Sequence, residues 1–229
     1  MTKAANVKVV SVDLGGTLVD FSQSLRPIWR TLLGNDCPND SLKHHWDRAT
    51  EILREKLSDA AKGETGFKNI RAIFQESFED FFSEIRLDFD PRVAAEKWIR
   101  GHDLRNVYAD AKLFLAAVDR KYRLCLSSDC DLEMIADIDE LYSFDAVFSS
   151  ESLKCYKLDP QFWMRVSEHY GLPTDNILHV GDDTSDIVGP AKLGILTCWV
   201  NRGGRKWDHE VKPDFEVTSL SRIAEILGN

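Results

Sequence analysis

The fold of this chain is decided by the stretch Val7-Lys8-Val9-Val10-Ser11-Val12-Asp13-Leu14-Gly15-Gly16-Thr17-Leu18-Val19. Its first half, residues 7–12, is mostly apolar and β-branched, a pattern that predicts a buried strand. An aspartate and a glycine-rich turn follow this strand directly. Active sites of parallel sheets lie beyond the carboxyl ends of their strands. Asp13 is therefore a candidate nucleophile or metal ligand.

Short apolar segments alternate with helical segments after residue 107. Further strands are expected at Leu124–Ser127, Ala146–Phe148, Ile177–Val180, Leu196–Val200 and Phe215–Val217, with helical patterns between them. Such alternation is typical of a parallel, doubly wound α/β sheet of the Rossmann-like kind. The strand at residues 7–12 belongs to the same sheet.

Residues 22–105 show helical periodicity and no convincing strand. Helices are expected near Ser24–Leu33, Ser41–Ala61, Lys68–Ile85 and Pro91–Gly101. This block is predicted to be an all-α insertion that splits the sheet domain after its first strand. The expected domains are a core of residues 1–20 and 106–229 and a helical domain of residues 21–105.

Composition excludes several classes of function. The formal charge of −9 and the isoelectric point near 5.2 argue against a nucleic-acid partner. No apolar run approaches the roughly 20 residues that a membrane span needs, and the N-terminus lacks a secretory pattern. The five cysteines include no Cys-x-x-Cys pair, which argues against zinc and against a disulfide framework. A cytoplasmic location is expected, and nothing indicates an oligomeric state.

Polar side chains follow four of the predicted strands. They are Asp13 and Thr17, then Ser127 and Ser128, then Lys157, then Asp182, Asp183 and Asp186. Carboxylates suit Mg²⁺, which takes oxygen ligands and keeps water or phosphate oxygens in its shell. A lysine, a serine hydroxyl and the backbone N–H groups of the Gly15-Gly16-Thr17 turn would position a phosphoryl group. The sequence therefore predicts a Mg²⁺-assisted phosphoryl-transfer site at one edge of the sheet.

These motifs, in this order, resemble those of the haloacid dehalogenase-like hydrolases, most of which are Mg²⁺-dependent phosphatases. The resemblance implies that Asp13 is the nucleophile and forms an aspartyl-phosphate, and that Ser127 and Lys157 hold the phosphate. Asp13, the Gly15 carbonyl, Asp182 and Asp186 would serve the metal, with Asp183 as a further candidate. The helical insertion resembles the class I cap of this family. Its Lys62–Gly66 segment is a candidate for substrate selection.

Gly15 is the main departure from the family pattern, because relatives usually carry there an aspartate that protonates the leaving group. General acid–base help contributes ~10²–10⁴ in rate, so a slow phosphatase or another chemistry is implied. The leading prediction is a phosphatase for a small phosphorylated metabolite. Carbon–halogen hydrolysis, carbon–phosphorus cleavage and non-catalytic phosphate binding stay open. Carbon–phosphorus cleavage would need a Schiff-base lysine, for which Lys43, Lys56 and Lys62 are available.

Overall fold

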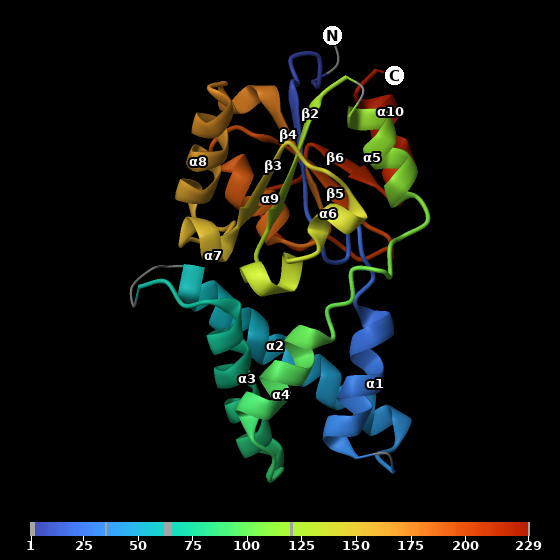
Figure 1. Cartoon of the computed structure of the whole chain (residues 1–229), viewed down its shortest axis with the longest axis vertical. Coiled ribbons are helices and arrows are strands. Elements are labelled where there is room, and N and C mark those ends of the chain that lie inside the picture. The colour runs from blue at the N-terminus through green and yellow to red at the C-terminus, as the bar shows by residue number, and fades with distance from the viewer. Residues whose placement is uncertain (1–2, 35, 62–65, 120, 229) are drawn as a thin grey trace.

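The computed structural model describes residues 3–34, 36–61, 66–119 and 121–228, and contains one six-stranded sheet below which a helical body is attached (Figure 1). All strand pairs are parallel, in the order β3-β2-β1-β4-β5-β6. The strands are β1 (Val9–Val12), β2 (Arg123–Ser128), β3 (Ala146–Ser149), β4 (Ile177–Gly181), β5 (Leu196–Val200) and β6 (Phe215–Val217). The predicted doubly wound parallel sheet is confirmed.

The strand order places β1 at the centre of the sheet, between β2 and β4. Val12 is in register with Leu126 of β2 and Val180 of β4, so β1 ends one residue before β4 and two residues before β2. All four residues of β1 are buried, which explains why the strand lacks the polar alternation of a half-exposed sheet. The residue after β1 therefore emerges in the middle of the carboxyl edge.

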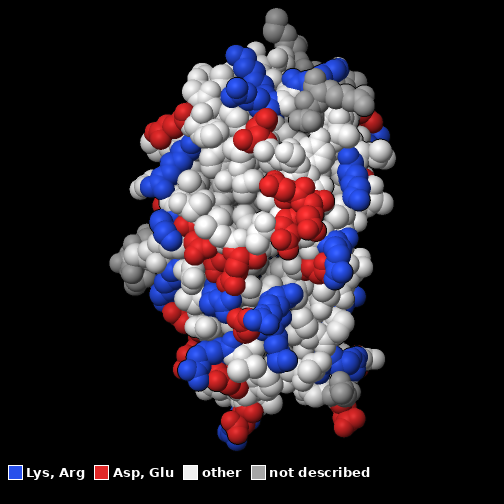
Figure 2. Space-filling model, viewed as in Figure 1, with Lys and Arg blue, Asp and Glu red and all other residues white. Residues whose placement is uncertain are grey.

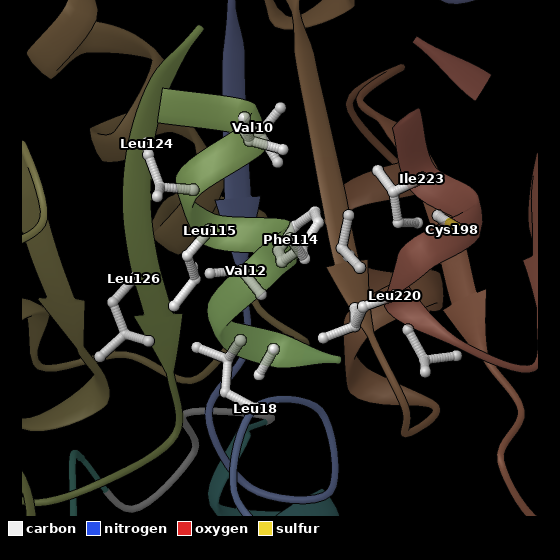
Figure 3. Packing of buried hydrophobic residues seen from close by; sticks show 14 of the residues in the cluster. Val10, Val12, Leu18, Phe114, Leu115, Leu124, Leu126, Cys198, Leu220 and Ile223 are labelled. Atoms are coloured by element: carbon white, nitrogen blue, oxygen red, sulfur yellow. The ribbon is translucent and has the colours of Figure 1, made fainter. Parts of the chain in front are cut away.

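Helices cover both faces of the sheet. On one face, α5 (Ala111–Asp119) packs Phe114 and Leu115 toward Val10 and Val12, and the C-terminal helices complete the same cluster (Figure 3). The C-terminal helices are η3 (Leu220–Arg222) and α10 (Ile223–Ile226). On the other face lie α7 (Ser150–Leu153), α8 (Pro160–Tyr170) and α9 (Ser185–Ala191), with a short 3₁₀ turn, η2 (Thr174–Asn176), before β4.

The segment 132–141, one of the helical patterns between the predicted strands, contains two short helices. They are the 3₁₀ helix η1 (Leu132–Ile135) and α6 (Ile138–Leu141). Ile135 at the end of η1 and Ile138 at the start of α6 are both buried. Figure 2 shows acidic side chains gathered over α6, where Asp137, Asp139 and Glu140 are exposed.

The helical body contains α1 (Ser22–Leu33), α2 (Asn39–Ala61), α3 (Ile70–Ile85) and α4 (Pro91–Arg100). It has a hydrophobic cluster of its own, in which the aromatic face of α3 packs on Trp29 and Trp98. We call these four helices the cap. The domain boundaries near residues 20 and 106 stay a prediction.

Contacts at two places join the cap to the sheet domain. The two segments that connect the cap to the sheet domain run side by side. Val19 forms a bridge with Val107, and the Asp20 amide donates to the Asn106 carbonyl at 2.8 Å. On the opposite side, the Asp131 carboxylate accepts hydrogen bonds from the amides of Ile70 and Arg71 at 2.7 and 2.8 Å. The cap is thus held at both ends. In the described part of the chain, none of the helices combines the length and the apolar character needed to cross a membrane.

Candidate active site

Asp13 lies at the centre of the carboxyl edge and is almost fully buried. Its amide donates to the Val180 carbonyl at 2.9 Å, which continues the β1–β4 ladder by one residue. Its Oδ1 atom accepts hydrogen bonds from Lys157 Nζ at 2.7 Å and from Ser128 Oγ at 3.1 Å. These two donors hold one carboxylate oxygen in place and leave the other for chemistry or for a metal.

Lys157 is positioned by contacts of its backbone. Trp163 Nε1 donates to the Lys157 carbonyl at 2.7 Å, and the Lys157 amide donates to Asp129 Oδ1 at 2.9 Å. The same carbonyl approaches Gly189 so closely that a Cβ there would lie 1.8 Å from it. Only glycine allows this approach, so α9 and the lysine loop are packed backbone to backbone.

Asp186 accepts three hydrogen bonds. Lys157 Nζ lies 2.5 Å from its Oδ1 atom, and His179 Nε2 lies 3.0 Å from the same oxygen. The Asp183 amide donates to Oδ2 at 2.9 Å. Asp186 is therefore a fully buried carboxylate with several partners of opposite charge or dipole, the arrangement that keeps a buried acid ionised.

A buried chain of hydrogen bonds continues from His179 across the sheet. His179 Nδ1 lies 2.9 Å from Ser11 Oγ, and Ser11 Oγ lies 2.7 Å from Ser127 Oγ. His179 is thus a core histidine with a hydrogen-bond partner at each ring nitrogen. Its contact with Asp186 is a connection that the sequence alone did not indicate.

Burial and mutual charge interactions shift the pKa values of Asp13, Asp186 and Lys157 in different directions. Burial raises the pKa of Asp13 to about 7, with the Asp186 charge acting in the same direction and Lys157 opposing both. Burial would also raise the pKa of Asp186, but Lys157 and His179 outweigh it and hold that pKa below its usual range. Burial would lower the pKa of Lys157, yet Asp13 and Asp186 keep it well above its ordinary value. The lysine therefore stays charged.

Asp182 completes an acidic cluster. Oxygen atoms of Asp13, Asp182 and Asp186 lie within 4.8 Å of one another. Burial, helped by the charges of Asp186 and Asp13, raises the pKa of Asp182 well above its usual value. Arg205 Nη2 lies 3.2 Å from Asp182 Oδ2, a partly exposed contact at the rim that offsets little of this charge.

Two adjacent serines have different surroundings. The predicted phosphate ligand Ser127 is fully buried and bonded to Ser11, whereas the Ser128 hydroxyl reaches Asp13. Successive side chains of a strand point to opposite faces. Because β2 runs to Ser128, one residue further than expected, the structure brings Ser128 to the site and turns Ser127 into the core.

The loop residues after Asp13 have distinct roles. Gly16 has a φ of +76° and packs against Asp182, where a Cβ would lie 2.5 Å from the carboxylate. A Cβ on Gly15 would lie 3.1 Å from Cε2 of Phe21, so an aromatic ring stands beside this position. The Thr17 hydroxyl is buried and, among the described residues, has no hydrogen-bond partner.

A cavity of about 360 Å³ lies between the sheet edge and the cap. Its floor includes Asp13, Ser128, Lys157, Asp182, Asp183 and Asp186, and its cap side includes Leu53, Arg54, Leu57, Ile70, Phe74 and His102. Lys43 and Lys56 do not line it and instead form ion pairs with Asp47 and Asp80. Residues 62–65, part of the segment expected to select substrate, lie outside the described residues.

Comparisons with known proteins agree with this geometry. A family model described as haloacid dehalogenase-like hydrolase matches residues 7–194. An (S)-2-haloacid dehalogenase of Pseudomonas putida is 28% identical over 44% of this chain and 46% of its own length. A phosphoserine phosphatase of Thermus thermophilus is 28% identical over 58% of this chain and 55% of its own length. The chain thus matches about half the length of these curated relatives.

The fold is shared over a longer span. The crystal structure of a putative hydrolase of this family, YfnB from Bacillus subtilis bound to magnesium, superposes with a TM-score of 0.82 at 18% identity. The match covers 97% of this chain and 99% of the other. Together with the family match over most of the sequence, this similarity leads to one conclusion: the chain belongs to the haloacid dehalogenase-like hydrolases.

Proposed function

We propose that this hydrolase is a Mg²⁺-dependent phosphatase that acts through Asp13. The acidic cluster of Asp13, Asp182 and Asp186 is the observation that carries the proposal. Among the described residues, Lys157 is the buried cation that contacts two of these carboxylates, and Arg205 reaches Asp182 at the partly exposed rim. Burial and the neighbouring carboxylates raise the pKa values of Asp13 and Asp182. A hard divalent cation fits such a set of oxygen ligands.

The described residues divide the work as follows. Lys157 and Ser128 hold Oδ1 of Asp13, so Oδ2 is the oxygen available to attack phosphorus. The phosphorus–oxygen bond to the leaving group breaks as the bond to Asp13 forms, and water then hydrolyses the aspartyl-phosphate. Lys157 stays charged and stabilises the negative charge of the phosphoryl group in the transition state. Mg²⁺ held by Asp13, Asp182 and Asp186 would supply further charge neutralisation at the phosphoryl oxygens.

The surroundings of Gly15 restrict the leaving group. Residue 15 supplies no acid, and the Phe21 ring beside it provides no proton. Substrates whose leaving group departs as a stable anion, such as aryl or acyl phosphates, should therefore react fastest. Phosphates of simple alkyl alcohols should react slowly, because an alkoxide needs a proton as it leaves.

A second candidate function is the hydrolysis of a carbon–halogen bond. The apolar contact between Gly15 and Phe21 favours it, because halide departs without a proton. Asp13 would then attack carbon, form an ester and release halide, and water would hydrolyse the ester. Asp182 speaks against this function, since such enzymes need no metal and a third carboxylate in the site would repel the substrate anion.

Two assays distinguish these functions. We expect hydrolysis of p-nitrophenyl phosphate in Mg²⁺, its loss in EDTA, and no turnover by Asp13→Asn. Chloride release from 2-chloropropionate is measured in parallel with the same variant. Asp13-dependent chloride release that EDTA leaves unchanged, without phosphate release, would replace the phosphatase proposal by the second candidate.

A further inference from the structure

His102 lies just after α4, the last helix of the cap. When its ring is neutral, one tautomer is fixed by a hydrogen bond. Its Nδ1 atom lies 2.8 Å from the Trp98 carbonyl oxygen. A carbonyl can only accept a hydrogen bond, so Nδ1 carries the hydrogen. In the neutral ring, Nε2 is then a hydrogen-bond acceptor.

The ring is enclosed by aromatic side chains. The His102 ring lies 4.7 Å from the Phe21 ring, edge to face, and 5.9 Å from the Phe74 ring, nearly parallel. Burial lowers the pKa of His102, so the ring is neutral near pH 7.

His102 lines the cavity, and its second ring nitrogen, Nε2, is the candidate atom to meet a ligand there. Within the described residues, no hydrogen bond reaches this atom, and the buried polar side-chain atoms without a partner are Thr17 Oγ1, Tyr170 OH and Arg202 Nε. The unpaired Nε2 is therefore accessible, and His102 lines the cavity above Asp13. An acceptor in this position loses free energy unless water or a ligand donates to it.

We propose that His102 is a specificity-determining residue whose Nε2 atom accepts a hydrogen bond from the leaving group of the substrate. This inference rests on the proposed phosphatase function. The substrate class is a phosphate ester of an apolar or aromatic alcohol that carries a second hydroxyl or N–H group. The apolar part of the leaving group is accommodated by Phe21, Leu53, Leu57, Ile70, Phe74 and Met134, which line the same cavity.

Phenyl phosphate and 4-hydroxyphenyl phosphate test this proposal, because they differ mainly by one hydroxyl donor. We expect the wild-type protein to favour the hydroxyl compound by about fivefold to tenfold in kcat/KM, the effect of one hydrogen bond. In His102→Phe the preference should disappear, because phenylalanine offers no acceptor to the second hydroxyl. The Trp98 carbonyl keeps a hydrogen bond from the Gly101 amide in this variant.

His169→Phe is the matched control. His169 packs on Phe148 and Tyr170 and does not line the cavity, so the preference should be kept. Hydrolysis of both compounds at equal efficiency by the wild-type protein would overturn the role of His102 and leave the phosphatase function standing. A preference that survives in His102→Phe would also overturn it. Hydrolysis of neither compound would refute both proposals. The wild-type comparison decides the question even if His102→Phe does not fold.

Discussion

The Phe21 ring contacts the space that a side chain at residue 15 would occupy: a Cβ on Gly15 would lie 3.1 Å from Phe21 Cε2. Residue 15 is a glycine and carries no acid, and the Phe21 ring would hinder an acidic side chain placed there. The two residues act as a pair: the glycine removes the acid, and the aromatic ring covers the space.

This pairing predicts the outcome of restoring the acid. Gly15→Asp alone should gain little activity on an alkyl phosphate, because Phe21 must move to admit the side chain. Gly15→Asp combined with Phe21→Ala should be at least ~10-fold faster than Gly15→Asp, a part of the ~10²–10⁴ that general acid catalysis supplies. Steady-state kinetics with both variants measure the difference, and Phe21→Ala alone is the control. Equal rates for the single and double variants would mean that the ring does not obstruct residue 15.

The two adjacent serines should respond differently to truncation. Ser128→Ala removes a donor to Asp13 Oδ1 and should lower kcat by about 10-fold. Ser127→Ala removes a core hydrogen bond to Ser11 and should cost about 1 kcal/mol of unfolding free energy with kcat nearly unchanged. Kinetics and urea unfolding on both variants test this. The reverse assignment would place Ser127 in the site, as the sequence suggests.

Mg²⁺ should stabilise the folded protein. Binding by the native state alone adds ~2.7 kcal/mol at a concentration of 100 times Kd, which raises the melting temperature. Asp182→Asn should remove most of this increase, because Asp182 belongs to the acidic cluster. Asp183→Asn is the control, because Asp183 is outside this cluster and its described hydrogen bonds with Asp186 are made by its backbone amide and carbonyl. Thermal unfolding with and without Mg²⁺ measures the shift, and an unchanged shift in Asp182→Asn would exclude that carboxylate as a ligand.

Acid should destabilise the protein partly through His102. Burial lowers the folded-state pKa of this ring below its unfolded value near 6.5, so the unfolded state binds more protons below that pH. Its contribution to stability is therefore present above about pH 6.5 and lost as the pH falls. His102→Phe should lose less unfolding free energy than the wild-type protein between about pH 7.5 and about pH 5.5. Urea unfolding at the two pH values checks this, and equal losses would show that the ring is not protonated on unfolding.

The contact between Asp131 and the start of α3 should control how the cap sits on the cavity. Asp131→Ala frees the amides of Ile70 and Arg71, and we expect a cost of ~1 kcal/mol and a KM several-fold higher. Asp90→Ala is the matched control, because Asp90 caps α4 within the helical body and touches no residue of the sheet domain through its carboxylate. It should cost a similar free energy and leave KM unchanged. A KM effect of equal size in both variants would assign the change to general loss of cap stability.

Much of the site followed from the sequence. Asp13, Lys157 and Asp186 come together because each lies at or just beyond the carboxyl edge of one parallel sheet, and hydrophobic periodicity is enough to locate that edge. The alternation of short apolar strands with helices determined the fold class for the same reason. A local sequence pattern is sufficient here because a buried strand appears in the sequence as a short run of apolar residues.

The tertiary structure decided what depends on register and on contacts between distant residues. β2 ends at Ser128, one residue later than the sequence predicts, with Ser127 in the core and the Ser128 hydroxyl at Asp13. Sequence patterns do not locate strand ends to one residue, although such a difference changes the face on which each side chain lies. His102 and Phe21 are separated by the whole cap in sequence, yet their rings lie 4.7 Å apart because the two connections between cap and sheet run side by side. No local pattern reports such a contact, since its energy comes from packing that exists only after the cap has folded back onto the sheet.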